Sequence, residues 1–153
     1  MPPRRGSCHG GFTVIEMLLV VVVFGILLSI AYVRLTPSLD HARVNRAAAV
    51  LATDLQYARM LAVRQREPIA VIALGSAKAY RIRGRDTTVI HRERLMGPDT
   101  EFALDAFSAS PLSVELFPNG VATTTTTFTL GRQGYQRQVR LTRAGQVRII
   151  RVP

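Results

Sequence analysis

Three patterns of apolar and polar residues follow one another along the chain. Residues 12–33 are almost uninterruptedly apolar. Between residues 38 and 64, apolar residues recur every three or four positions, which is the spacing of one face of a helix. Beyond residue 68, short apolar or alternating runs are separated by turn residues, which indicates strands. A helix followed by strands predicts an α+β fold, in which a long N-terminal helix packs on an antiparallel β domain.

The apolar segment, residues 12–36, has the length of a membrane-spanning helix. About 20 residues at about 1.5 Å per residue cross a hydrocarbon core of about 30 Å. Arg4 and Arg5 precede this segment, and basic residues favour the cytoplasmic side of a membrane. We therefore expect a single-pass transmembrane helix with its N-terminus in the cytoplasm and the rest of the chain exported.

One carboxylate, Glu16, interrupts the apolar segment near its start. A charged side chain within a bilayer costs on the order of 2.5–3.5 kcal/mol on insertion scales, so Glu16 calls for a partner. Cleavage after Gly11 would create one, because it would leave a free amine on Phe12. The amine of one subunit could then neutralise Glu16 of its neighbour in a bundle of helices.

The run Gly11-Phe12-Thr13-Val14-Ile15-Glu16 resembles the processing motif of type IV pilins and of the pseudopilins of type II secretion. The resemblance implies that residues 1–11 are a leader, that prepilin peptidase cuts after Gly11, and that it N-methylates Phe12. It also implies that Glu16 directs assembly with other pilins through the N-terminal helix. The protein is then expected in the bacterial inner membrane, with its C-terminal domain in the periplasm. The alternative is an ordinary signal anchor that carries a glutamate by chance.

A second helical stretch, amphipathic, is expected over residues 37–66 and ends before Pro68. Pro37 would kink or interrupt the helix, because proline cannot donate a backbone hydrogen bond. Asp54 and several other polar residues are expected mostly off the apolar face. That face consists of Val44, Ala47, Ala48, Leu51, Leu55, Ala58, Leu61 and Ala62.

Residues 67–153 are expected to form a β-rich domain. Three turns are indicated, at Gly84-Arg85-Asp86, at Pro118-Asn119-Gly120 and at Arg143-Ala144-Gly145. The last of these would join a final hairpin. Strands are predicted at residues 69–74, 79–83, 87–90, 112–117, 123–130, 138–142 and 146–152.

Three further segments are similar to the GspH/FimT branch of pseudopilins and minor pilins. They are residues 54–59, the turn Phe117-Pro118-Asn119-Gly120, and Ala144-Gly145-Gln146-Val147-Arg148. This resemblance implies a helical spine that carries a two-sheet β domain. It also implies a low-abundance subunit at or near the tip of a filament, in either a type II secretion pseudopilus or a type IV pilus.

No catalytic site is predicted. His9, His41 and His91 are isolated and lack the spacing of metal ligands. No glycine-rich phosphate loop follows a strand, and the acidic residues are scattered. We therefore expect a structural protein, not an enzyme, without a metal or cofactor. The peptidase acts on this chain.

Basic residues dominate the chain, which has a net charge of +10 and a single lysine. Arginine suits bidentate binding of phosphate, but a biased genome composition produces the same preference. From residue 116 onward there is no acidic residue. The same stretch contains Arg132, Arg137, Arg140, Arg143, Arg148 and Arg151.

DNA is a candidate partner of this arginine-rich end. Arg140, Arg143, Arg148 and Arg151 could neutralise phosphates. FimT-like minor pilins are associated with DNA uptake through a C-terminal G-R-x-R sequence, whereas glutamine replaces the first arginine here, at Gln146. Alternation along a strand would place Arg148 and Arg151 on opposite faces and would let Arg140 and Arg148 share one. The other interpretation is a solvated basic face, or one that pairs with acidic neighbours in the filament.

Overall fold

The computed structural model describes residues 12–152, without the side chains at positions 31 and 33–36. The chain divides into two compact units, one ending at Pro37 and the other comprising Ser38–Pro153. A single helix, α1 (Val14–Gln65), contributes to both units, and Pro37 lies inside it. The helix therefore extends on both sides of Pro37, although Pro37 has no N–H to donate to the helical hydrogen bonds.

The N-terminal unit is the first half of α1. Large apolar side chains between Val14 and Ile30 are exposed, with exposed fractions from 41% to 80%. In the described part of the chain, no helix is long and apolar enough to count as a membrane span. The transmembrane role of residues 12–36 stays a prediction.

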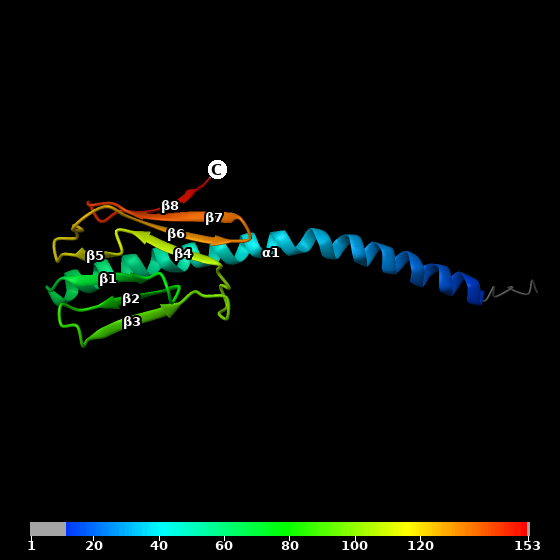
Figure 1. The fold of residues 1–153 in the computed structure, drawn as a ribbon, viewed down its shortest axis with the longest axis horizontal. Helices are drawn as coiled ribbons and strands as arrows, with labels where there is room; N and C mark the ends of the chain where they lie inside the picture. The colour runs from blue at the N-terminus through cyan, green and yellow to red at the C-terminus, as the bar shows by residue number, and fades with distance from the viewer. Residues whose placement is uncertain (1–11, 153) are drawn as a thin grey trace, which may run out of the picture. The chain divides into compact units, whose positions relative to one another are not determined.

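The second unit contains two four-stranded antiparallel sheets (Figure 1). Their orders are β3-β2-β1-β5 and β4-β6-β7-β8. This arrangement confirms the predicted α+β fold with a two-sheet antiparallel domain. The strands are β1 (Ile69–Leu74), β2 (Ala79–Arg83), β3 (Ile90–Leu95), β4 (Ala106–Ser110), β5 (Ser113–Leu116), β6 (Thr126–Arg132), β7 (Tyr135–Leu141) and β8 (Val147–Arg151).

Three strand predictions need correction. The third strand begins at Ile90, because residues 87–89 belong to a turn in which the Asp86 carboxylate accepts the Thr88 N–H at 3.0 Å. Strand β4 is not predicted, since its Ala-Phe-Ser-Ala-Ser sequence is short and only weakly apolar. Residues 123–125 precede β6, and the Thr123 N–H bonds to the Glu115 carbonyl at 2.9 Å.

One hydrophobic core joins the second half of α1 to both sheets. The predicted apolar face of the helix is buried, except that Leu61 is only partly covered. Leu51 and Leu55 are fully buried, and such burial stabilises a fold by about 1.5–3 kcal/mol per side chain. Strand β1 alternates buried and half-buried residues, as a strand with one core-facing side should. The expectation that Asp54 lies off the apolar face is wrong, because Asp54 is buried among these residues.

Candidate functional site

The start of α1 is closed by a threonine cap. The Glu16 N–H bonds to Thr13 Oγ1 at 3.3 Å and to the Thr13 carbonyl at 3.1 Å. Thr13 and Glu16 therefore have the spacing of a capping box, in which Ser or Thr precedes Glu by three residues. The exposed Glu16 carboxylate lies in the first turn, where the helix dipole favours negative charge. The Thr-x-x-Glu spacing therefore indicates the start of the helix in the sequence itself.

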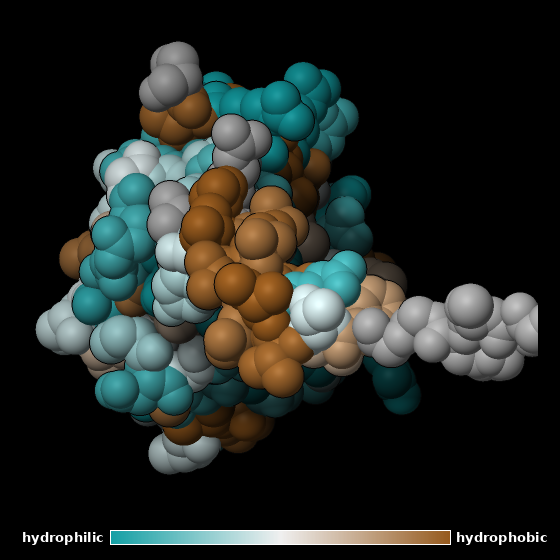
Figure 2. All heavy atoms as spheres, turned by 90° about the vertical axis from the view of Figure 1, so that its right-hand side faces the viewer, coloured by the Kyte–Doolittle hydropathy of each residue, from teal (hydrophilic) through white to brown (hydrophobic). Residues whose placement is uncertain are grey.

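Of the predicted processing residues, Gly11 lies outside the described residues. Phe12 precedes the helix and is 74% exposed. The large apolar side chains from Val14 to Ile30 are exposed in the described structure, and exposed apolar surface of this extent marks an interaction site. Figure 2 shows a face of the molecule on which hydrophobic residues gather in a large brown cluster, with smaller brown patches elsewhere.

A buried carboxylate ties the second half of α1 to the first sheet. Asp54 accepts hydrogen bonds from the Tyr80 hydroxyl at 2.6 Å, from Arg92 Nη1 at 2.5 Å and from Arg94 Nε at 2.9 Å. Arg92 also lies over the Tyr57 ring, 4.4 Å from its centroid. Burial raises the pKa of Asp54, but the bonds from Tyr80, Arg94 and Arg92 outweigh burial and hold this pKa below its ordinary value.

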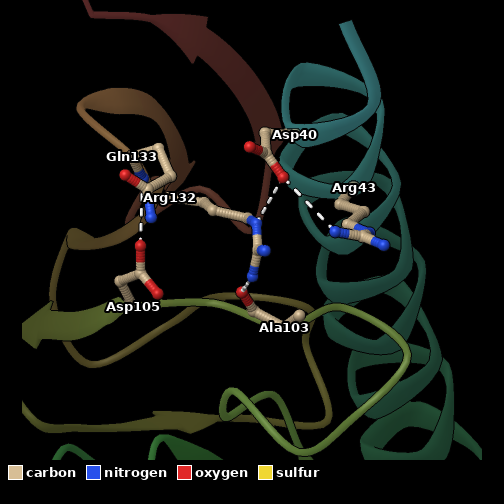
Figure 3. A network of polar contacts seen from close by, with 6 residues as sticks. All are labelled: Asp40, Arg43, Ala103, Asp105, Arg132 and Gln133. Carbon is tan, nitrogen blue, oxygen red and sulfur yellow. Dashed lines mark hydrogen bonds and ion pairs between the residues drawn. The ribbon is translucent and has the colours of Figure 1, made fainter. Parts of the chain in front are cut away.

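A second carboxylate on α1 engages the other sheet (Figure 3). Arg132 Nε, at the end of β6, lies 2.5 Å from Asp40 Oδ1, and Arg132 Nη1 donates to the Ala103 carbonyl. Arg43 Nη1 lies 3.3 Å from the same Asp40 oxygen. The hydrogen bond from Arg132 lowers the pKa of Asp40 more than burial raises it. Beside this network, the Gln133 N–H donates to Asp105 Oδ2 at 3.0 Å.

Two of the six C-terminal arginines are thus anchors of the fold. Arg132 Nε donates to Asp40 Oδ1, and Arg137 Nε donates to Asn45 Oδ1 at 2.7 Å. The Tyr135 hydroxyl lies 3.2 Å from the same Asn45 oxygen, and the Tyr135 ring stacks on His41 with 3.9 Å between centroids. Sequence reasoning grouped these arginines with the others, because nothing local distinguishes an inward from an outward arginine.

The four arginines proposed to bind DNA are all exposed. Arg140 and Arg148 are directly opposite each other on β7 and β8, which confirms that they share a face. Arg151 lies opposite Arg137 and three residues beyond Arg148, so it points to the other face. Arg143 lies in the connecting turn, where its N–H bonds to Thr125 Oγ1 at 3.2 Å. The structure brings two of the four together, and like charges placed directly opposite favour an external anion.

The two predicted glycine turns meet at the second half of α1. Gly145 has a φ of +73°, and a Cβ there would lie 2.1 Å from the Gly120 carbonyl oxygen. Arg59 Nη1 donates to the Gly145 carbonyl at 3.4 Å. Only glycine fits this contact, because it lacks a Cβ and tolerates positive φ. Within residues 12–152, no cluster of three or more histidine, cysteine, aspartate or glutamate residues is placed to hold a metal ion.

Comparison with known proteins places these features in context. The sequence model of the family described as type II transport protein GspH matches residues 47–145. The prokaryotic N-terminal methylation motif matches residues 6–32. No curated protein matches the chain.

Two crystal structures of the type IV minor pilin FimU of Pseudomonas aeruginosa PAO1 have a similar fold. The structure in space group P65 is 24% identical, covers 69% of this chain and 91% of its own, and has a TM-score of 0.55. The structure in space group P21 is 26% identical, covers 72% of this chain and 88% of its own, and has a TM-score of 0.54.

Proposed function

The chain belongs to the GspH family and is a minor pilin or pseudopilin of a type IV pilus or type II secretion system, and on this basis we propose how it enters its filament. Prepilin peptidase cleaves after Gly11 and methylates the new N-terminal Phe12. The first half of α1 then packs among the helices of other pilins. The subunit occupies a position at or near the tip.

One observation supports this proposal above the others, namely the exposed apolar half of α1 with a single carboxylate in its first turn. Packed helices would cover the apolar side chains, and burial of each is worth about 1.5–3 kcal/mol. An uncompensated carboxylate would oppose that burial. The amine of Phe12 from a neighbouring subunit compensates it, so Glu16 favours the register in which the two groups meet.

Pilins are membrane-anchored filament subunits, and the orientation of this one follows from its leader. We propose that Arg4 and Arg5 keep the N-terminus in the cytoplasm and that Ser38–Pro153 enters the periplasm before assembly. The family and fold are those of structural proteins. The ion pairs of Asp40 and Asp54 suit this role, because they hold both sheets on the helix that enters the filament.

Mass spectrometry of the protein recovered from cells tests this processing. We expect the chain to begin at an N-methylated Phe12, and we expect Gly11→Val to retain the leader, because the peptidase needs a small residue before the cut. A filament-incorporated subunit that still begins at Met1 would contradict the proposal.

A second candidate function is the capture of DNA for natural transformation. The facing pair of Arg140 and Arg148, with Arg143 in the adjoining turn, supports it, since no acidic residue lies in this part of the chain. Gln146 stands where the FimT-like sequence has arginine, and Arg151 points to the opposite face. A DNA site here would therefore rest mainly on Arg140, Arg143 and Arg148.

A further inference from the structure

A groove of about 800 Å³ lies within the globular unit, between the last turns of α1 and the start of β8. Met60 and Val63 of the helix form its apolar floor together with Val147 of β8. Met60 is 64% exposed and Val63 is 52% exposed, although they lie one turn apart on a helix whose neighbouring alanines, Ala58 and Ala62, are fully buried. Two large apolar side chains at this spacing form a continuous patch.

The apolar surface continues along β8. Val147 lies opposite the buried Leu141, and Ile149 lies opposite the buried Val139, so both point to the core-facing side of their sheet. Ile149 is nevertheless 48% exposed. Among the described residues, no strand lies beyond β8, because it is the outermost strand of this sheet.

The groove is basic as well as apolar. Arg59, Arg64 and Arg148 line it, and no acidic residue does. None of these three arginines forms an ion pair with a carboxylate in the described part of the chain. Arg59 reaches the Gly145 carbonyl, and Arg148 reaches only the side-chain oxygen of Gln146, at 3.5 Å. The electrostatic complement of this groove is therefore a carboxylate-bearing partner.

The backbone of β8 offers a further attachment. Among the described residues, β8 pairs with β7 alone, so one of its edges has no strand partner. Such an edge presents N–H and C=O groups to an added strand. The groove lies where this edge begins.

We propose that the groove and the open edge of β8 bind an extended segment of a neighbouring filament subunit in which acidic and apolar residues alternate. An added strand would turn one set of side chains toward Met60, Val63 and Ile149 on the core-facing side. The other set would lie beside Arg148, on the face that it shares with Arg140. Arg59 and Arg64 would contact carboxylates at the mouth of the groove.

This inference deepens the proposed function, and its assignment to a neighbouring subunit rests on that function. The three features together favour a peptide over a nucleic acid. Phosphates would use the arginines, but a phosphate backbone gains nothing from the apolar floor or from a strand edge. The alternating pattern follows from the start of β8, where Val147 and Ile149 lie on one face and Arg148, opposite Arg140, lies on the other.

Fluorescence anisotropy with the mature full-length chain in detergent tests the proposal. The probe is a short synthetic peptide of alternating glutamate and valine, and the comparison ligands are the matching lysine–valine peptide and single-stranded oligothymidine. We expect the glutamate peptide to bind more tightly than either comparison ligand, and we expect Arg64→Glu combined with Arg148→Glu to weaken its binding by about tenfold or more. Arg85→Glu is the matched control, because Arg85 is also exposed but lies outside the groove.

Amide hydrogen exchange distinguishes strand addition from loose charge attraction. On binding of the glutamate peptide, backbone amides in β8 should exchange more slowly, whereas those in β3, an edge strand of the other sheet, should not change. Equal binding of the lysine peptide or of oligothymidine would overturn the inference. Two further results would overturn it: an affinity for the glutamate peptide that the double substitution does not change, and amide exchange in β8 that the bound peptide does not slow.

Filament incorporation separates this inference from the proposed function. A chain that is processed and incorporated but does not bind the peptide contradicts the groove proposal alone. A chain that binds the peptide but is never processed or incorporated contradicts the assembly proposal and leaves the groove intact.

Discussion

The hydroxyl of Tyr80 on β2 lies 2.6 Å from Oδ2 of Asp54 on α1, and both side chains are buried. Burial and the bond to Asp54 raise the pKa of Tyr80, so its hydroxyl stays protonated and donates. Arg92 and Arg94 of β3 bind the same carboxylate. One helical residue thus connects α1 to two adjacent strands of the first sheet.

Replacement of Asp54 by alanine should destabilise the globular unit by about 2–3 kcal/mol, because it removes the shared acceptor of three hydrogen bonds, two of them charged. The cost stays below that of a fully buried pair, since Arg92 and Arg94 are each about one-third exposed and can be solvated. Urea unfolding followed by circular dichroism measures it. Asp99→Ala, at an exposed loop position, is the control, and equal stability of the two variants would contradict the role of Asp54.

Stability should also fall in acid. The pKa values of Asp40 and Asp54 in the folded chain lie below the ordinary value of 3.8, so the unfolded chain binds protons first as the pH falls. Their stabilising contribution is complete above the unfolded pKa and is lost as the pH drops through the folded one. Unfolding free energy should therefore decrease below about pH 5. In a chain that carries Asp40→Asn and Asp54→Asn the slope should be shallower, and an unchanged slope would exclude these two groups as its source.

Glu16→Ala should abolish or strongly reduce entry into filaments, because the charge that pairs with the Phe12 amine is gone. Glu16→Gln should behave similarly, since it keeps the size and hydrogen-bonding capacity of the side chain but not its charge. Immunoblots of sheared filament and membrane fractions give the measurement. Thr13→Ala is the control: loss of this cap costs a helix about 0.5–2 kcal/mol without removing the carboxylate. Normal incorporation of both Glu16 variants would rule out the pairing mechanism.

Gly145→Ala should destabilise the globular unit by about 2–4 kcal/mol, because an added Cβ meets the Gly120 carbonyl and a non-glycine residue is strained at positive φ. Gly134→Ala provides a matched control, since Gly134 has a φ of +82° but nothing within 4 Å of the added atom. We expect a loss of about 1–2 kcal/mol there, from backbone strain alone. Equal losses in urea unfolding would show that the Gly120–Gly145 contact has no role.

DNA capture predicts a particular response to salt. Mobility-shift titrations of the mature chain should show affinity falling steeply as salt rises. Arg140→Ala and Arg148→Ala should each lower the affinity and reduce the salt slope by about 0.7–0.9. Arg132→Ala is unsuitable as a DNA variant, because Arg132 holds Asp40 and its loss would disturb the fold. Absence of binding at low salt would end this candidate function.

Much of the fold can be predicted because its signals are local. The three- to four-residue spacing of Val44 through Ala62 identifies the helix face that is buried, and β1, β2 and the final hairpin follow from short alternating or apolar runs. Strand β4 escapes prediction, since Phe107 is its only large apolar residue and its alanines and serines carry little pattern until the neighbouring β6 pairs with them. The shift of β3 to Ile90 depends on a turn held by the Asp86 side chain.

Some residues of the candidate sites can likewise be predicted from the sequence, and others only from the tertiary structure. Gly11, Phe12 and Glu16 can be proposed from the sequence, because their contiguous run resembles the processing motif of type IV pilins. The arginines cannot be distinguished in this way. Arg132 reaches the buried Asp40 and Arg137 reaches the exposed Asn45, both about 90 positions earlier in the chain, whereas Arg140 and Arg148 lie opposite each other on the surface.

Local periodicity and turn chemistry are therefore sufficient for a long helix followed by strands, with β4 as the exception, and for the buried helix face. The predicted processing motif depends on a contiguous run of residues near the N-terminus. Packing decided what Asp54 contacts, which arginines stay exposed, how the Gly120 and Gly145 turns meet, and that a basic, apolar groove borders β8. The physical reason is that hydrophobic spacing specifies which side of an element faces inward. Charged and glycine contacts between distant elements exist only after those elements have come together.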